Sequence, residues 1–198
     1  MAVLLFNRYD FSGVEAKDQG LKKYINLSPV VVPKTCGKYG TVSIHKSKMS
    51  IVERFMTKLF VPGHRGKKHK LTSGHVVGGY QRIFNAVNDG FSIIESRTKK
   101  NPIQVLVDAI ENGALYEEVM GYRVGGTIAR KAVIVAPQRR LDVSLKLIAQ
   151  DIFSKSFHNK KKFPQVLAEE LIEIAGNDQR NNVIRERQRL EKEAEGAR

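Results

Sequence analysis

The sequence predicts a mainly α fold: a bundle of five or six helices with one protruding β-hairpin and an extended basic N-terminal arm. Three observations predict it. Apolar residues recur at helical spacing over most of the chain after residue 49, a β-rich run at about 117–136 surrounds a Gly-Gly pair, and glycine and proline interrupt the first 49 residues. The 198 residues, 41% of them hydrophobic, can bury one core. We therefore expect an arm at 1–49 and one helical domain at 50–198.

The arm contains repeated helix breakers and shows no sustained helical period. We expect it to be extended and basic, with short strands at most, and not to fold alone. Its apolar start, MAVLLF, stops at Asn7 and has no basic residues before it, so it resembles neither a signal peptide nor a membrane-spanning helix. We expect a cytoplasmic protein. The single cysteine, Cys36, excludes an internal disulfide framework and a cysteine-rich zinc site.

Helices are predicted at about 50–61, 76–94, 101–112, 141–152, 164–175 and from 181 onward. Ser50 and Glu53 have the spacing of a capping box, in which each side chain satisfies a backbone N–H at the helix start. Asn101-Pro102 is a typical pair of cap and first-turn residues. The last helix has strong helix formers but few apolar residues, so we expect it to pack by its first turns and then to project.

The hairpin is predicted from the segment RVGGTIARKAVIVAPQRR, residues 123–140. A two-residue turn at Gly125-Gly126, where glycine tolerates positive φ, would pair Arg123 with Ile128, Gly121 with Arg130 and Met120 with Lys131. This register places basic groups on both faces, and neither face near the tip has the alternation of a buried strand. We expect an exposed ribbon, ordered mainly by what it binds; the alternative is a hairpin that only caps the helical core.

Basic residues are segregated along the chain, whose net charge is +14. Between Gln19 and Asn88 there is one acid, Glu53, against thirteen lysines and arginines. Two further windows, 122–141 and 152–168, contain no acid at all. Ordinary soluble surfaces intersperse the two signs, so this distribution indicates a polyanionic partner, with nucleic acid favoured over an anionic membrane.

The residues of known catalytic and metal sites are missing. The five histidines form no ligand motif, and GHRGKK lacks the frame of a phosphate-binding loop. Aromatic residues make up 8% and tryptophan is absent, so a stacking platform for single strands is not indicated. We expect a nucleic acid to be recognised through its phosphate groups and its shape. We expect no cofactor, no metal and no enzyme activity. An independent nucleic-acid-binding factor and, less favoured, an RNA-processing enzyme remain as alternatives.

Several stretches in order resemble one family, the universal small-subunit ribosomal protein seven in its archaeal and eukaryotic form. They are RYDFSGVEAKDQGLKKYINL (8–27), SIVERFMTKLF (50–60), GKK (66–68), NPIQVLVDAIENGAL (101–115), GYRVGGTIARKAVIVAPQRRLDVSLKLIA (121–149), SFHNKKKFPQVLAEELIEIAG (156–176) and VIRERQRLE (183–191). The resemblance covers nearly the whole chain. Its specificity comes from the ordered set, with NPIQVLVDAIEN and the Gly-Gly hairpin leading into APQRR, whereas GKK or PQRR alone is a weak signal.

The resemblance implies a helical core with a protruding ribbon, binding to small-subunit ribosomal RNA, and help in nucleating assembly of the subunit head. It places the protein near the exit site, close to messenger RNA and transfer RNA, with ribosomal proteins nine and eleven as neighbours and no homo-oligomer. The matched positions that it assigns to RNA are Lys67, Lys68, Arg123, Arg130, Arg139, Arg140, Arg185 and Arg187. Charge, as much as resemblance, adds Lys34, Lys38, Lys46, Lys48, Arg65, Lys70, Lys131 and Lys146.

The chain departs from the family at two places. The 32 residues between GKK and Asn101 are more than the family has there, which indicates an insertion or a displaced counterpart of GKK. Glu186, Glu193 and Glu195 replace basic or neutral residues in the last helix, so we expect its far end to face solvent or a neighbouring protein instead of RNA.

Overall fold

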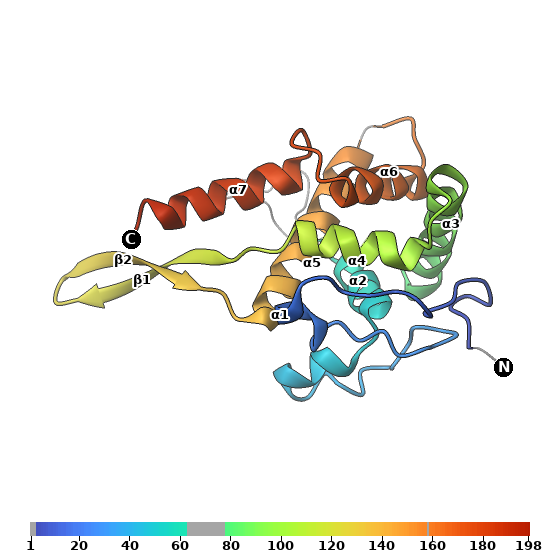
Figure 1. The fold of residues 1–198 in the computed structure, drawn as a ribbon, viewed down its shortest axis with the longest axis horizontal. Coiled ribbons are helices and arrows are strands. Elements are labelled where there is room, and N and C mark those ends of the chain that lie inside the picture. Colours follow the sequence, from blue (N-terminus) through green and yellow to red (C-terminus); the bar gives the residue numbers. More distant parts are fainter. Residues whose placement is uncertain (1–2, 63–77, 158) are drawn as a thin grey trace.

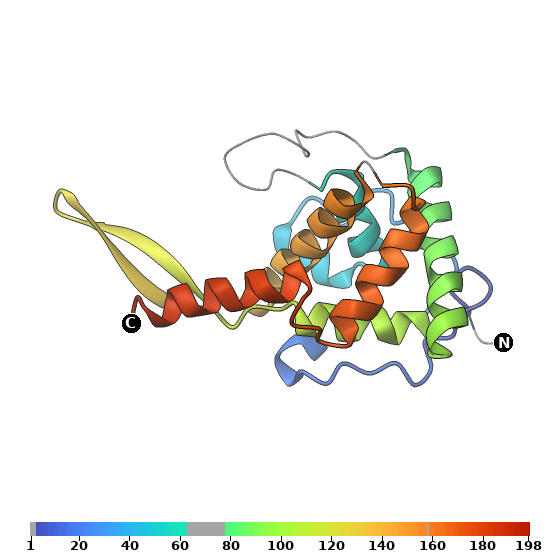
Figure 2. The ribbon, with the colours of Figure 1, turned by 90° about the horizontal axis from the view of Figure 1, so that it is seen from above.

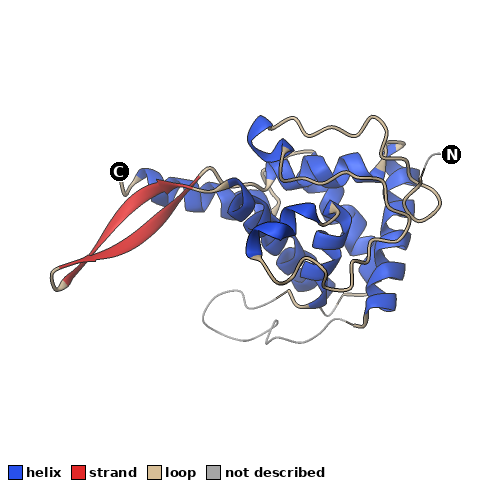
Figure 3. Cartoon of the chain, turned by 90° about the horizontal axis from the view of Figure 1, so that it is seen from below, coloured by secondary structure: helices blue, strands red, loops and turns tan. Residues whose placement is uncertain are grey.

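The computed structural model describes residues 3–62, 78–157 and 159–198. Its elements, in chain order, are α1 (Gln19–Lys22), the 3-10 helix η1 (Ser43–Lys48), α2 (Ile51–Phe60), α3 (Tyr80–Thr98), α4 (Pro102–Asn112), β1 (Glu117–Val124), β2 (Thr127–Ile134), α5 (Pro137–Ser156), α6 (Phe163–Ala175) and α7 (Asn182–Glu195). The two strands form one antiparallel hairpin. The predicted class, a helical bundle with one protruding hairpin, is confirmed (Figure 3).

One hydrophobic core lies between α2, α3, α4, α5 and α6, and the largest of its fully buried side chains include Phe55 and Phe91. The predicted apolar spacing accounts for it, because residues three and four apart on a helix share one face. Helix α6 packs against α3, α4 and α5. It approaches α3 closely at Gly90, where an added Cβ would lie 2.7 Å from Cδ2 of Leu167. This glycine, unfavourable in a helix interior on propensity alone, therefore permits the α3–α6 contact.

Of the two helix caps predicted from the sequence, the one at Asn101 is present and the one at Ser50 is not. The Asn101 side chain accepts a hydrogen bond of 3.0 Å from the Ile103 N–H, as a cap should, and Pro102 opens α4. The capping box at Ser50 and Glu53 was wrong, since Ser50 makes no side-chain cap bond. The Glu53 carboxylate instead accepts from the backbone N–H and the hydroxyl of Thr35, at 2.7 and 2.6 Å. It ties α2 to the N-terminal segment and so is not available to the helix start.

The N-terminal segment has little regular structure, as expected, but its first half does not project. Leu5, Tyr9, Phe11, Leu21 and Ile25 are buried in the common core, and Figure 1 shows the segment lying along the helices. Sequence periodicity missed this because a segment without regular structure buries its apolar residues at irregular spacing. Basic residues from 34 onward remain at the surface. The division of the chain at residue 49 stays a prediction.

The second helix was predicted from Val76, and the structure describes α3 from Tyr80. Val76 and Val77 lie outside the described residues, as do residues 69–75 of the proposed insertion. The remainder of that stretch is α3 itself and its two ends. Helices α5 and α6 cover the predicted ranges, and Pro137 and Pro164 lie in their first turns, where proline has no hydrogen bond to lose.

The hairpin projects from the helical body, and α7 runs beside its base (Figures 1 and 2). The first turn of α7 packs against the core through the buried Val183 and Ile184, as predicted. The far end of α7 does not project freely, which corrects the expectation. The Glu191 carboxylate accepts a bond of 3.1 Å from the Tyr116 N–H, and Arg198 reaches Glu117 with bonds of 2.6 and 2.8 Å. Of the unexpected glutamates, Glu186 and Glu193 both pair with Arg189 of the same helix, so their charges are met within the chain itself.

Candidate nucleic-acid interface

The ribbon has the predicted register: Arg123 is opposite Ile128, Gly121 opposite Arg130, and Met120 opposite Lys131. Because partners across a ladder share a face, Arg123 and Arg130 lie on one face and Lys131 lies on the other. All three side chains are exposed. The alternative, a hairpin that caps the helical core, is contradicted by the projection of the strands and by their exposure beyond Val119.

Apolar side chains accompany these cations along the ribbon. Met120, Tyr122, Val124 and Ile128 are all exposed, and Ile128 retains 69% of its accessible surface. At the tip, only Gly125 of the two glycines has a positive φ, of +61°, which is the φ pattern of a type II′ turn and requires glycine at that position. The result is a narrow, two-sided projection that can reach into a space that the globular body could not enter.

Arg139 and Arg140, adjacent in APQRR, have different surroundings. Arg139 is exposed and binds both carboxylate oxygens of Glu118, at 2.6 and 2.8 Å. Arg140 retains 7% of its accessible surface, donates to the Leu115 carbonyl at 2.8 Å and to Asp18 at 2.7 Å, and lies over the Tyr116 ring. Arg140 therefore fixes the base of the ribbon to α1 and α5, and its surroundings do not favour a contact with RNA.

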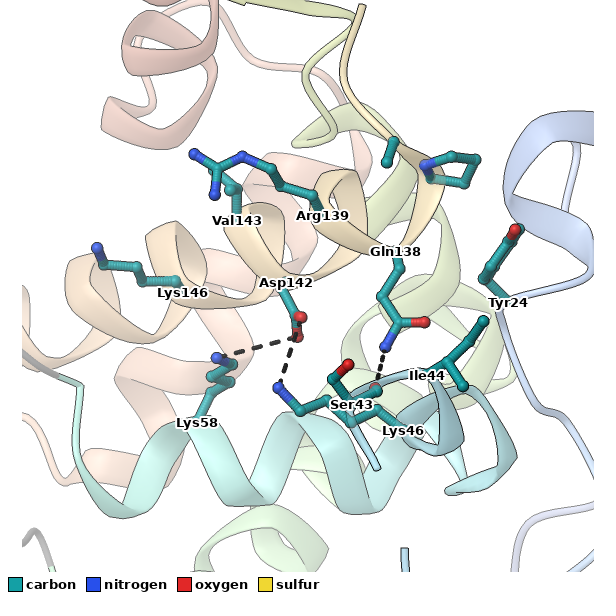
Figure 4. A pocket seen from close by; sticks show the side chains of 12 residues that line it. Tyr24, Ser43, Ile44, Lys46, Lys58, Gln138, Arg139, Asp142, Val143 and Lys146 are labelled. Carbon is teal, nitrogen blue, oxygen red and sulfur yellow. Dashed lines mark hydrogen bonds and ion pairs between the residues drawn. The ribbon is translucent and has the colours of Figure 1, made fainter. Parts of the chain in front are cut away.

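A groove of about 620 Å³ lies between η1, α2 and the first turns of α5, next to the ribbon base. Figure 4 shows Lys46 from η1 and Lys58 from α2 on either side of Asp142 of α5, with Arg139 one turn before Asp142 and Lys146 one turn after it. Gln138 closes one side by donating a bond of 2.8 Å to the Ser43 carbonyl. Two predicted regions, the N-terminal segment and APQRR, thus meet at one surface.

Lys58 and Asp142 were missed by the sequence analysis. Asp142 lies 3.9 Å from Lys58, 4.0 Å from Lys46 and 3.3 Å from the buried Arg54. Burial lowers the pKa of the Lys58 ammonium, and the nearby cations act in the same direction, whereas Asp142 opposes them. The spacing of Arg54 and Lys58, four residues apart on one helix, was the signal that could have drawn attention to this face of α2.

The other lysines of the N-terminal segment are exposed. Lys34 lies over the ring of Tyr80, 4.9 Å from its centre, and Lys38 lies 5.8 Å from the centre of the Tyr39 ring. Lys48 is exposed at the end of η1. Four other predicted residues lie outside the described part of the chain: Arg65, Lys67, Lys68 and Lys70.

The basic residues near the C-terminus are partly engaged within the chain. Arg187 donates a bond of 2.6 Å to the Asn112 carbonyl, so it holds α7 against the end of α4. Arg185 is exposed, with one bond of 3.2 Å to the Gln179 carbonyl. In the acid-free window 152–168, Lys161 pairs with Glu169 at 2.6 Å, while Lys160 and Lys162 are exposed. We regard Arg185 as a better candidate for RNA than Arg187.

Lys155 of the same window belongs to a buried ionic cluster. Its ammonium lies 2.5 Å from Glu170, 3.4 Å from Asp151 and 3.5 Å from Glu173. Burial raises the pKa of Glu170 to about 7, and the neighbouring Asp151 carboxylate acts in the same direction, while Lys155 opposes it. Asn181, the cap of α7, donates to Glu170 at 2.9 Å. This cluster joins α5, α6 and α7, which is a structural task.

Within the described ranges, no group of three or more histidine, cysteine, aspartate or glutamate side chains could hold a metal ion. None of the helices in those ranges is long and apolar enough to cross a membrane.

Comparison with known proteins gives the family. The profile of the family described as ribosomal protein S7p/S5e matches residues 21–198. The chain belongs to this family. Membership implies a structural role in the ribosome, and such proteins are generally not enzymes.

Two curated relatives, both called small ribosomal subunit protein uS7, align with the chain over 95% or more of their length. The one from Nanoarchaeum equitans is 38% identical over 198 residues, which is 100% of both chains. The one from Archaeoglobus fulgidus is 38% identical over 196 residues, covering 99% of this chain and 95% of the relative. The family resemblance inferred from the ordered motifs is confirmed.

Proposed function

We propose that this chain is a structural component of the small ribosomal subunit, in the cytoplasm, that binds small-subunit ribosomal RNA through its ribbon and the groove at the ribbon base. Family membership supports the ribosomal role, and the exposed arginines of a projecting ribbon support the contact with RNA. The single observation on which we rely most is the ribbon, because two strands without a core of their own gain order from a partner. Phosphate contacts would supply most of the affinity, and fit to a folded junction the specificity.

We further propose the finer assignments that the family resemblance implies. The protein would help nucleate the head of the subunit and lie near the exit site, close to messenger RNA and transfer RNA. Ribosomal proteins nine and eleven would be its protein neighbours. The proposed RNA contacts are Arg123, Arg130, Lys131, Arg139, Lys46, Lys48, Lys146, Lys34, Lys38 and Arg185, with Arg65, Lys67, Lys68 and Lys70 added from the sequence alone. Arg140 and Arg187 are better explained by their bonds within the chain.

The test removes the two arginines that share one face of the ribbon. We expect Arg123→Ala with Arg130→Ala to weaken binding to a head-domain fragment of small-subunit ribosomal RNA. The slope of log affinity against log salt should fall by roughly 0.9 for each lost phosphate contact. Helix content, measured by circular dichroism, should not change, because the ribbon lies outside the helical core.

The matched control is Lys99→Ala with Lys100→Ala, which removes the same charge from an exposed site at the end of α3. A salt slope that changes no more in the ribbon variant than in this control would mean that the ribbon does not contact phosphate. A preference of the wild-type protein for duplex DNA over the RNA fragment, at equal salt, would contradict the ribosomal role and favour an independent nucleic-acid-binding factor.

A further inference from the structure

The groove at the ribbon base contains one carboxylate surrounded by cations. Asp142 is the shared partner of Lys46, Lys58 and Arg54, which come from η1 and from two successive turns of α2. A second hollow of about 470 Å³ adjoins the groove and is also lined by Lys46, Lys58 and Asp142. The carboxylate therefore lies where two surface depressions meet. Figure 4 shows Lys46 and Lys58 directed at it from the groove.

Asp142 is the one carboxylate that lines the groove, and it does not balance the cations there; Glu53, which lines the adjoining hollow, binds Thr35. Arg54 retains 4% of its accessible surface and needs a counter-ion, so Asp142 is largely engaged by it. Lys46 and Lys58 lie 4.0 and 3.9 Å from Asp142, the outer limit of an ion pair. Burial lowers the pKa of Lys58, and the neighbouring cations act in the same direction against Asp142. Lys146 has no acidic partner among the described residues. An anion entering here would meet cations that are only partly neutralised.

The start of α5 adds to the same field. Pro137, Gln138 and Arg139 line the groove, and Ala136, the cap residue, contributes no side-chain bond. The positive end of the helix dipole therefore opens toward the lysines. Arg139, at the mouth, is held by Glu118 in a bidentate pair, the geometry that arginine also uses for phosphate. Two cationic sites of the groove thus each face a carboxylate: Arg139 faces Glu118, and the two lysines face Asp142.

We propose that this groove binds a backbone phosphate of RNA, and that Asp142 is an internal substitute for that phosphate in the free protein. The inference rests on the proposed function, since it takes RNA as the ligand. On binding, Lys46 and Lys58 turn from Asp142 to the incoming phosphate, while Arg54 keeps Asp142 as its partner. The carboxylate holds the lysines in place before binding and, by its charge, weakens attachment of RNA that does not fit the rest of the surface.

The experiment compares Asp142→Asn with Asp108→Asn, a control that removes one negative charge from a lysine-paired aspartate on α4. Affinities for fluorescently labelled polyuridylate and for the head-domain RNA fragment are measured over a range of salt. A partly exposed ion pair of this kind is weak, so we expect Asp142→Asn to bind both RNAs roughly two- to fivefold more tightly than Asp108→Asn does. The gain should diminish as salt increases.

Equal affinities of the two variants, or weaker binding by Asp142→Asn, would overturn the inference and leave Asp142 as a counter-ion for Arg54 alone. Failure of the wild-type protein to bind either RNA would instead overturn the proposed function, so the two failures are distinguishable.

A second pair of variants covers the case in which Asp142→Asn does not fold. Lys46→Gln with Lys58→Gln keeps Asp142 and its bond to Arg54, and Lys99→Gln with Lys100→Gln removes the same charge elsewhere. The groove variant should bind the RNA fragment more weakly and with a shallower salt slope than this control. Identical slopes would contradict a phosphate in the groove.

Discussion

At the scale of single residues, Arg139 and Arg140 show why equal charge does not imply equal function. Both follow Pro137 in one basic motif. Arg139 is on the surface with one acidic partner, whereas Arg140 is buried between the ribbon base and Asp18. The first can exchange its partner for a phosphate. Arg140 cannot leave its site without depriving the Leu115 carbonyl and the Asp18 carboxylate of a hydrogen-bond donor.

This difference predicts opposite effects of two neighbouring substitutions. Arg140→Ala should lower the free energy of unfolding by about 2–3 kcal/mol, because it leaves the Leu115 carbonyl and Asp18 without their buried donor. Arg139→Ala should change it by less than about 1 kcal/mol, since an exposed pair contributes little. Urea denaturation followed by circular dichroism measures both, and equal losses of stability would contradict the assignment of Arg140 as a structural residue.

At the scale of elements, the direction of the ribbon depends on α7 and on the joint from which α7 starts. Glu191 of α7 and Arg198, three residues beyond its end, hold the ribbon base. The start of α7 is capped by Asn181, which also donates to Glu170 of the buried ionic cluster. Changes in this cluster can therefore reach the ribbon through one rigid helix.

The cluster predicts a dependence of stability on pH. The pKa of Glu170 is raised from 4.5 to about 7 by burial and by Asp151, with Lys155 opposing, so the folded protein holds a proton that the unfolded chain releases. The stability due to this proton is complete below pH 4.5 and is lost as the pH rises to about 7. Among the described residues, Asp151 and Lys155 are the charged groups that act on Glu170, and Glu173 shares Lys155 with it.

Glu170→Gln removes the titrating group and keeps a hydrogen-bonding side chain. The stability of the wild type relative to this variant should fall between pH 4.5 and about 7 and be constant above that range, as measured by urea denaturation at a series of pH values. Glu173→Gln, which removes a more exposed carboxylate of the same cluster, is the matched control. Parallel curves for wild type and Glu170→Gln across this range would show that Glu170 does not hold the proton.

At the scale of the whole molecule, periodic segments were predictable and irregular ones were not. The spacing of Leu141, Leu145 and Ile148 predicted α5, and Gly125-Gly126 predicted the register of the ribbon, because both depend on local geometry. The burial of Leu5, Tyr9 and Phe11 was not predictable, because it depends on contacts with helices distant in sequence.

In the candidate interface, too, the features set by local sequence were predictable and those set by distant contacts were not. Charge segregation identified the ribbon and the basic N-terminal residues, since the signal is in the composition of each window. The groove could not be found in this way, because Lys46, Lys58 and Asp142 meet only in the folded chain. Arg140 shows the converse: a basic motif does not reveal which of its members will be buried.

The central claim is that this chain is an integral protein of the small ribosomal subunit. Its most direct test is sedimentation of a cell extract in a sucrose gradient, followed by a high-salt wash of the small-subunit fractions. We expect the protein to co-sediment with the small subunit and to remain there through the wash, because many phosphate contacts and a fitted surface act together. Recovery of the protein in the soluble fractions at the top of the gradient would contradict the claim.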